Sequence, residues 1–191
     1  MYKIKWFLVI CALMTSQVVS AFDNNRKGFI IGIGAGLQTV DTDFNYLGSN
    51  IGSDSESGLA TSFKIGGGIT NQFALYYVRN ASWFSAPYFD GFATSDITYS
   101  IGILGLEAVY FLSPSSSSAY LLGAIGIGDI SAPFEEDIES DTGDAFMFGG
   151  GYEISEHVQV EATLLSTDID GGSGINLESS SFQLTVNYVW Y

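Results

Sequence analysis

The feature that most limits how this chain can fold is an alternation of apolar residues with small or polar residues at a period of two. It is clearest near the C-terminus, in SFQLTVNYVW, where Ser, Gln, Thr and Asn occupy every second position. Because successive side chains of a β-strand point to opposite faces, this segment predicts a strand with one polar and one apolar face. The apolar face carries Phe182, Leu184, Val186, Tyr188 and Trp190.

Alternation of this kind recurs along the chain and predicts eight strands. In the third segment the frame is unclear around Val78 and Arg79. In the fourth segment the frame changes, which predicts a β-bulge near Leu104. The eight segments lie at residues 28–38, 58–69, 73–84, 97–111, 120–128, 144–154, 157–165 and 179–191.

The connections between these segments alternate between short turns and long, polar loops that hold most of the acidic residues. The short ones lie at residues 70–72, 113–118 and 155–156, and the long ones at 39–57, 85–96, 129–143 and 166–178. An even number of strands with short turns at one end and long loops at the other is the plan of a membrane barrel. We therefore expect an all-β fold, an eight-stranded antiparallel up-and-down transmembrane β-barrel in which the last strand closes against the first.

The N-terminal residues predict export. Lys3 and Lys5 precede an apolar run, and small residues at 19–21 provide a cleavage site, so residues 1–21 are predicted to be a cleaved signal peptide. The apolar run is too short to cross a bilayer as a helix. We expect residues 22–191 to form one barrel domain in the bacterial outer membrane, without disulfides because the single cysteine is Cys11.

Charge and composition exclude several classes of protein. After residue 21, four basic residues stand against 21 acidic ones, a formal net charge of −17, so nucleic acid is not an expected partner. Charged residues make up 14% of the sequence, which is low for a water-soluble domain. No apolar run reaches the roughly 18 residues of a membrane helix. A closed β-barrel is the remaining structure that can span a membrane.

The composition of the two strand faces indicates which of them meets lipid. The non-apolar face consists mainly of Gly, Ala, Ser and Thr, which suits the interior of a narrow barrel. Charged residues on that face are expected to pair in the lumen, Lys64 with Glu107 or Glu161, because an isolated buried ion is costly. Aromatic residues at strand ends are expected at the membrane interface. The predicted lumen charges are Lys64, Arg79, Glu107, Glu153 and Glu161, and the predicted interface aromatics are Tyr110, Tyr152, Tyr188 and Trp190.

Several segments resemble a known family. GFIIGIGAG, GLEAVYFLSP, GGGYEIS and HVQVEATLL are similar to the small eight-stranded OmpA/OmpX-type outer membrane barrels, and the resemblance covers residues 22–191. The last strand resembles the C-terminal signal of bacterial outer-membrane proteins, with its apolar register offset by one because Tyr191 follows. The resemblance implies a monomer in contact with outer-membrane lipid and lipopolysaccharide, recognised through its last strand by the barrel assembly machinery.

The sequence contains few residues that indicate chemistry. Some outer-membrane barrels modify lipid A with a histidine at their outward-facing end, but His157 follows a short turn at the opposite end and is expected to be a solvated turn residue. The acidic segment FEEDIESD matches no EF-hand spacing and is expected to be a solvated loop, with Ca²⁺ or Mg²⁺ binding as the alternative. The candidate ligands in this segment are Glu135, Glu136, Asp137, Glu139 and Asp141.

The sequence therefore predicts a non-enzymatic barrel without a cofactor, with a structural or surface-interaction role carried by its acidic extracellular loops. Eight strands leave an interior just wide enough for side chains, which excludes a wide porin. The alternatives are a narrow, cation-selective channel and, third, a lipid A-modifying enzyme.

Overall fold

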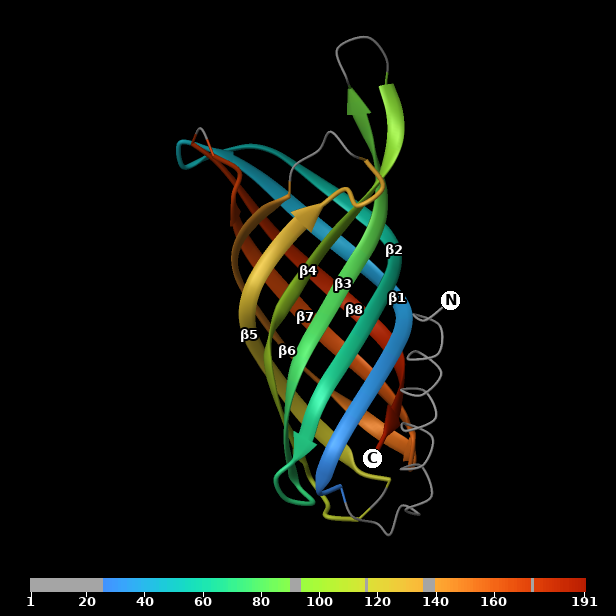
Figure 1. Ribbon diagram of the computed structural model, residues 1–191. Helices are drawn as coiled ribbons and strands as arrows, with labels where there is room; N and C mark the ends of the chain where they lie inside the picture. The colour runs from blue at the N-terminus through green and yellow to red at the C-terminus, as the bar shows by residue number, and fades with distance from the viewer. Residues whose placement is uncertain (1–25, 90–93, 116, 136–139, 173) are drawn as a thin grey trace, which may run out of the picture.

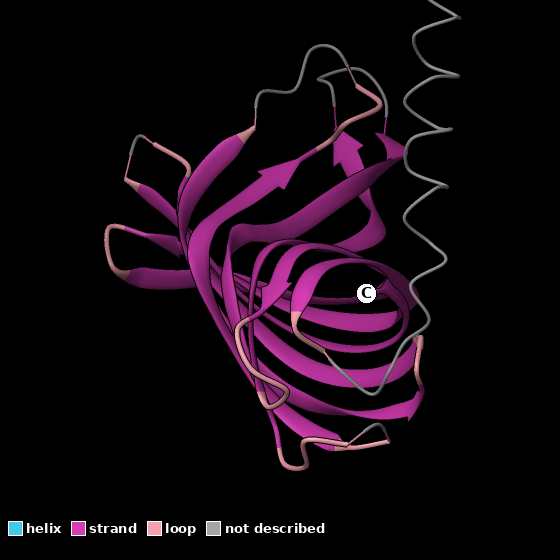
Figure 2. Ribbon diagram, turned by 60° about the horizontal axis from the view of Figure 1, so that its bottom comes forward, coloured by secondary structure: helices cyan, strands magenta, loops and turns pink. Residues whose placement is uncertain are grey.

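The computed structural model describes residues 26–89, 94–115, 117–135, 140–172 and 174–191, so the predicted signal peptide lies outside the described residues. Eight antiparallel strands form one closed barrel, in which each strand pairs with its neighbours in the chain and β1 pairs with β8 (Figures 1 and 2). The strands are β1 (Gly28–Tyr46), β2 (Ser49–Gly68), β3 (Phe73–Phe89), β4 (Thr94–Phe111), β5 (Ala119–Ser131), β6 (Asp141–Ser155), β7 (Val158–Asp170) and β8 (Ile175–Trp190). The predicted eight-stranded antiparallel up-and-down barrel is confirmed.

We call the end of the barrel where the short connections lie the short-turn end. The opposite end, where β1 is joined to β2, β3 to β4, β5 to β6 and β7 to β8, is the hairpin end. Short connections join β2 to β3, β4 to β5 and β6 to β7, and β1 begins and β8 ends at the same end of the barrel (Figure 1). The closing pair runs in continuous register from Ile31 with Trp190 to Tyr46 with Ile175. In the part of the chain that the structure describes, no helix is long and apolar enough to span a membrane.

The predicted β-bulge near Leu104 is wrong. β4 pairs with β3 and with β5 without a register shift, and the breaks in register lie instead at Phe44/Asn45 in β1 and at Glu153/Ser155 in β6. The frame of the apolar residues changes in β4 because Ile103 is buried inside the barrel, whereas Leu104 and Leu106 face outward. In the sequence, an apolar residue that faces the lumen changes the apolar frame in the same way as a β-bulge would, so the two cannot be distinguished there.

Three of the four long loops are also mostly strand, contrary to the prediction. β1 and β2 remain paired up to Tyr46 and Ser49, so that only Leu47 and Gly48 form the turn. β3–β4 and β7–β8 likewise remain paired to Phe89 with Thr94 and to Asp170 with Asn176. Asp, Ser and Thr are poor strand formers alone, but the partner strand of a hairpin supplies their backbone hydrogen bonds. The described acidic residues of these three connections therefore lie on extended hairpins that project from the barrel (Figure 1).

The two faces of the wall differ as the alternation predicts. On β8, Ser181, Gln183, Thr185 and Asn187 are at most 2% exposed, while the residues between them are exposed. Glycines on the inner face leave room for large side chains: Gly151 lies opposite Tyr120, and a Cβ on Gly151 would lie 2.4 Å from the tyrosine ring. Exposed apolar residues of the outer face include Phe29, Ile33, Leu37, Leu59, Leu106, Ile125, Phe146, Phe148, Leu164 and Leu184.

Leu184→Arg is predicted to destabilise the barrel in a bilayer by about 2–4 kcal/mol, because the charge would face the hydrocarbon interior. Ser180→Arg, on the same face but nearer the hairpin end, should cost only about 0–1 kcal/mol. The free energy of unfolding of each variant is measured by urea titration in phosphatidylcholine vesicles. Equal costs for the two substitutions would contradict this orientation of the wall.

Candidate functional site

Lys64 on β2 reaches across the lumen to carboxylates on two other strands. Its Nζ donates hydrogen bonds to Glu107 Oε1 of β4 at 2.8 Å and to Glu161 Oε2 of β7 at 2.7 Å. All three side chains are buried, and the Tyr120 hydroxyl donates a further hydrogen bond to Glu161 Oε2 at 3.1 Å. Lys64 therefore contacts both of the partners considered for it, and the ion pairs connect opposite parts of the barrel wall.

This cluster holds one positive charge and two carboxylates. The remaining oxygens, Glu107 Oε2 and Glu161 Oε1, are buried without a hydrogen-bond partner among the described residues. Buried polar atoms of this kind are normally satisfied by ordered water or by a proton. The middle of the lumen thus has the chemistry to hold water, although it offers no wide path for it.

Arg26 closes the short-turn end of the barrel from inside. Its guanidinium donates to Glu153 Oε2 at 2.5 Å, and it lies 4.1 Å from the centre of the Phe111 ring. It also donates to the backbone carbonyls of Asn71 at 2.8 Å and Ser113 at 3.1 Å, in the β2–β3 and β4–β5 turns. The side chain is 1% exposed, so the guanidinium fills the lumen at this end and links the two turns to β6 by hydrogen bonds.

Tyr191 completes this closure from the other end of the chain. Its hydroxyl donates a hydrogen bond to Glu153 Oε1 at 2.9 Å. Burial and the nearby Glu153 carboxylate raise the pKa of Tyr191, so the phenol keeps the proton that it donates. The Glu153 carboxylate therefore accepts hydrogen bonds on both oxygens from Arg26, which precedes β1, and on Oε1 also from Tyr191, which follows β8. We call Arg26, Glu153 and Tyr191 the seam clasp.

The seam clasp is not apparent from the sequence, although Glu153 is expected in the lumen. Arg26 counted only as one of four basic residues, and no strand alternation includes it. Its position two residues before Gly28, where β1 begins, is the signal that could have pointed to it, because a side chain there reaches the mouth of the barrel.

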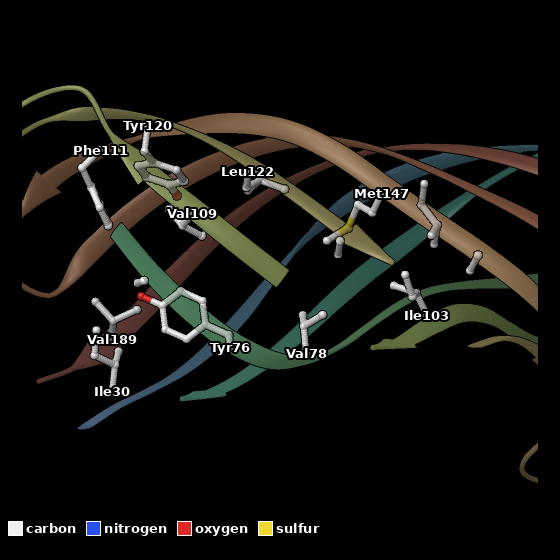
Figure 3. Close-up of a cluster of buried hydrophobic side chains, with 14 residues drawn as sticks. Ile30, Tyr76, Val78, Ile103, Val109, Phe111, Tyr120, Leu122, Met147 and Val189 are labelled. Atoms are coloured by element: carbon white, nitrogen blue, oxygen red, sulfur yellow. The ribbon is translucent and has the colours of Figure 1, made fainter. Parts of the chain in front are cut away.

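An apolar cluster fills the lumen next to the seam clasp. Figure 3 shows Tyr76 beside Val189 and Ile30, with Phe111 and Tyr120 across the lumen from them. The rings of Phe111 and Tyr120 lie 5.2 Å apart. The alternation predicted an interior mainly of small residues with a few charged ones, and these large apolar and aromatic side chains depart from that prediction. They exclude water from the short-turn end of the lumen.

Polar side chains fill the lumen toward the hairpin end. Gln183 donates a hydrogen bond to the Ser82 hydroxyl at 2.9 Å, and the hydroxyl groups of Ser82 and Ser181 lie 2.6 Å apart. The Asn80 amide is buried without a partner among the described residues. Apolar side chains such as Ile101 and Ile169 are buried in the same part of the barrel, so the interior there is mixed.

The prediction that Arg79 lies in the lumen is wrong. β3 alternates without interruption from Ala74 to Asn80, both of them buried, so Arg79 shares the outer face with Leu75 and Tyr77. The prediction failed because a charged residue was assumed to avoid the lipid-facing side.

On the outer face, Arg79 forms an ion pair with Asp129 of β5, in which Nη2 donates to Oδ2 at 2.9 Å. The guanidinium lies over Gly102, where a Cβ would be 2.6 Å from Nη1. A long side chain that reaches from the apolar belt to a carboxylate nearer the membrane surface reduces the cost of its charge.

The predicted interface aromatics lie on the outer face near the short-turn end, where Tyr110, Tyr152 and Tyr188 are exposed and Trp190 is half-buried. His157 lies at the same end. Its Nδ1 is 2.9 Å from the Val189 carbonyl oxygen, and its ring stacks on that of Tyr188 at 5.5 Å.

The candidate metal ligands are only partly described. Glu135 and Asp141 are exposed, whereas Glu136, Asp137 and Glu139 lie outside the described residues. Among the residues that the structure does describe, no three His, Cys, Asp or Glu side chains are grouped closely enough to hold a metal ion.

Lys64→Met is predicted to destabilise the barrel by about 3–5 kcal/mol, because it leaves two buried carboxylates without a cation. The triple variant K64M/E107Q/E161Q removes all three charges at similar volume and should recover most of that loss. Urea titration in vesicles at neutral pH measures both. If K64M were as stable as the wild type, Lys64 would not be neutralising buried charge.

Glu153→Gln should cost about 3–5 kcal/mol, since Arg26 would stay charged and buried without a carboxylate. Tyr191→Phe removes one hydrogen bond and should cost about 1 kcal/mol. The same titration orders the two variants, with the wild type as reference. A larger loss in Y191F than in E153Q would mean that the ion pair is not the main element of the seam clasp.

Comparisons with known proteins agree with this geometry. The family model described as outer membrane protein beta-barrel domain matches residues 7–189. Among solved structures, the chain is similar to Ail, the attachment invasion locus protein of Yersinia pestis, at 12% identity over 84% of this chain and 98% of that chain, with a TM-score of 0.54. OprG from Pseudomonas aeruginosa matches at 14% identity over 88% of this chain and 99% of that one, with a TM-score of 0.51.

Neisserial surface protein A matches at 15% identity over 84% of this chain and 96% of that one, with a TM-score of 0.51. No match was found among curated protein sequences. At these identities the solved structures show the shared fold, a small barrel of the bacterial outer membrane. Because the family model covers nearly the whole sequence, the chain belongs to the outer membrane protein beta-barrel domain family.

Proposed function

We propose that this protein is a non-enzymatic barrel of the outer membrane with a structural and surface-interaction role, carried by its extracellular hairpins. The observation that carries the proposal is the filled lumen, which Arg26 and the apolar cluster close at the short-turn end. In outer-membrane barrels the short turns face the periplasm and the longer connections face outward. The hairpin end, with its acidic residues, is then the part of the molecule that the environment can reach.

The hairpins offer the chemistry for contacts at the cell surface. Asp43, Asp54, Asp168 and Glu178 are exposed on them. Ail, a barrel of similar fold, is named for attachment and invasion and has been crystallised with the heparin analogue sucrose octasulfate. An acidic surface does not suit such a sulfated ligand, so a surface role for this chain requires a partner of the opposite charge.

The same proposal places the outer face in contact with membrane lipid and, at the hairpin end, with lipopolysaccharide. The exposed apolar side chains of β8, such as Leu184 and Val186, are available to the assembly machinery before the barrel closes. The buried pairs and the closed seam are consistent with a barrel that is complete as a monomer.

A narrow cation-selective channel is the second candidate. The unpartnered oxygens of Glu107 and Glu161 and the unpartnered Asn80 amide favour water in the middle of the lumen. The apolar cluster and Arg26 oppose it, because they leave the short-turn end closed by side chains. Lipid A modification has less support, since His157 bonds to a backbone carbonyl at the short-turn end, far along the strands from the hairpins.

Purified protein in planar bilayers is predicted to show no steady single-channel openings, because the lumen is closed at one end. Lipid A from cells that express it is predicted to have an unchanged mass. Steady openings would replace the proposal with the channel, and an altered lipid A mass would replace it with the enzyme.

A further inference from the structure

The apolar belt of the outer face has a defined edge toward the hairpin end, and Trp83 lies at that edge. Trp83 is paired with Leu59, which is 61% exposed, so the tryptophan ring also faces outward from the wall. Its Nε1–H donates a hydrogen bond to the Thr61 hydroxyl at 2.8 Å. The next outward residues toward the hairpins are Ser57 on β2 and Ser85 on β3, both exposed. An indole, with apolar faces and a polar N–H, suits the level at which hydrocarbon gives way to lipid headgroups.

The chain that follows β5 turns across the outer face toward this tryptophan. Pro133 and Phe134 are the central residues of a β-turn, in which the Glu135 N–H donates a hydrogen bond to the Ala132 carbonyl at 3.0 Å. Proline lacks an N–H and its fixed φ suits the first central position, so it ends the strand and directs the residue that follows. The ring centres of Phe134 and Trp83 lie 6.4 Å apart. In Figure 1 the chain leaves the tip of β5 toward β3 and β4. We call these four turn residues the outer-wall turn.

Protein atoms cover the outer face beside this tryptophan. Ser100 is paired with Trp83 and Ala81 with Gly102, and both Ser100 and Ala81 are 2% exposed although they face outward. The Arg79 guanidinium lies over Gly102. The first residue of the outer-wall turn is also 2% exposed. The outer-wall turn is therefore packed on the barrel wall at the edge of the apolar belt.

Phe134 itself is left largely uncovered by protein. Its exposed fraction is 73%, next to a tryptophan at the edge of the lipid-facing belt. A phenylalanine side chain gains about 1.5–3 kcal/mol when it moves from water into an apolar environment. In a membrane barrel the bilayer provides that environment at the edge of the belt. The ring of Phe134 thus continues a lipid interface that the fold already has.

Other occupants of this position fit less well. The charges on the wall beside the outer-wall turn, Arg79 and Asp129, form an ion pair and neutralise each other, so they do not select a charged partner. A second copy of the chain would bring its own acidic segment against this one, since Glu135 is followed by Glu136 and Asp137 in the sequence. Like charges brought together in this way oppose association.

We propose that the outer-wall turn is a membrane-surface anchor, in which Phe134 inserts beside Trp83 into the headgroup region of the bilayer. The partner is the lipid surface itself, recognised by its apolar and ester layer and not by its charge. The inference rests on the proposed surface role and names the partner of this one connection. Insertion of the ring fixes the start of the acidic β5–β6 connection at the level of the headgroups.

Tryptophan fluorescence tests where the side chain at position 134 lies. After residue 21 the tryptophans are Trp83 and Trp190, so the variant F134W/W83F/W190F carries its one indole in the outer-wall turn and keeps an aromatic ring at position 83. In phosphatidylcholine bilayers, bromine on the lipid chains quenches an inserted indole, and acrylamide quenches one in water. The ratio of bromine to acrylamide quenching is expected to be several-fold higher than in the control variant L47W/W83F/W190F, whose indole replaces the 76% exposed Leu47 at the tip of the β1–β2 hairpin.

Energy transfer tests whether the ring acts as an anchor. A donor dye is placed on the single cysteine of Glu135→Cys in the chain without residues 1–21, and the acceptor is carried by lipid headgroups. Adding Phe134→Ser should lower the ratio of docked to undocked turn about tenfold or more and reduce the transfer. Phe44→Ser, which changes a 39% exposed phenylalanine on β1, is the matched control and should leave the transfer unchanged. Each variant is checked for the heat-modifiable gel shift of a folded barrel.

Acrylamide quenching at position 134 equal to that at position 47 would place the ring in water and overturn the inference. Protection from both quenchers would place it against protein, such as a second copy, and would also overturn it. Unchanged transfer in a folded F134S barrel, or an equal loss in F44S, would contradict the anchor. Ion conductance or altered lipid A would overturn the proposed function and leave the quenching result standing. A silent barrel whose position 134 lies in water would overturn this inference alone.

Discussion

The carboxylate of Glu153 is held by a residue that precedes the first strand and a residue that follows the last one. Arg26 donates to both oxygens, and Tyr191 donates to one of them. The β1–β8 ladder closes the wall, and the seam clasp fixes its short-turn end from within, where the guanidinium also satisfies backbone carbonyls of two turns. With that end closed, a function that depends on contact with other molecules is left to the hairpin end.

The lumen and the hairpins differ in how their charged side chains are paired. In the lumen, Lys64 and Arg26 each meet carboxylates within hydrogen-bond distance, as buried ions must. At the hairpins, Asp43, Glu178 and Asp168 stand opposite one another without a described cation between them. Proteins keep locally unfavourable arrangements mainly at functional sites, supported by stability elsewhere in the structure. The well-paired lumen supplies that support, and the hairpins are where the local rules are broken.

Much of this architecture follows from the sequence because a period of two has one structural meaning. On β8 the alternation alone predicts that Leu184 faces out and Gln183 faces in, and the exposures agree. The failures have physical causes. Ile103 is apolar yet faces the lumen, and Arg79 is charged yet faces outward, because an ion pair or an apolar neighbour can make either face acceptable. The residue type therefore predicts which face of the barrel wall a side chain occupies less reliably than the unbroken register of its strand does.

The seam clasp and the contact between the β1–β2 and β7–β8 hairpins could not be predicted from the sequence for a different reason. Arg26 meets Glu153 across a separation of 127 residues, and Leu47 meets Gly174 only because two hairpins lean together. Such contacts depend on the closed three-dimensional arrangement and have no local sequence signal. The polar stretches around Asp43 and Asp168 resemble loops, since strand pairing between water-exposed polar residues has no apolar period to reveal it.

The central claim is that the apolar face of the wall meets lipid while the other face encloses a filled lumen. Nitroxide labels at single cysteines introduced at positions 182 to 187, in the barrel reconstituted in bilayers, test it through their collision rates with oxygen and with a water-soluble nickel complex. The account predicts oxygen-rich, lipid-like environments for labels replacing Phe182, Leu184 and Val186, and protection from both reagents for those replacing Gln183, Thr185 and Asn187. Access of the nickel complex to the first three positions, or an absence of alternation, would contradict it.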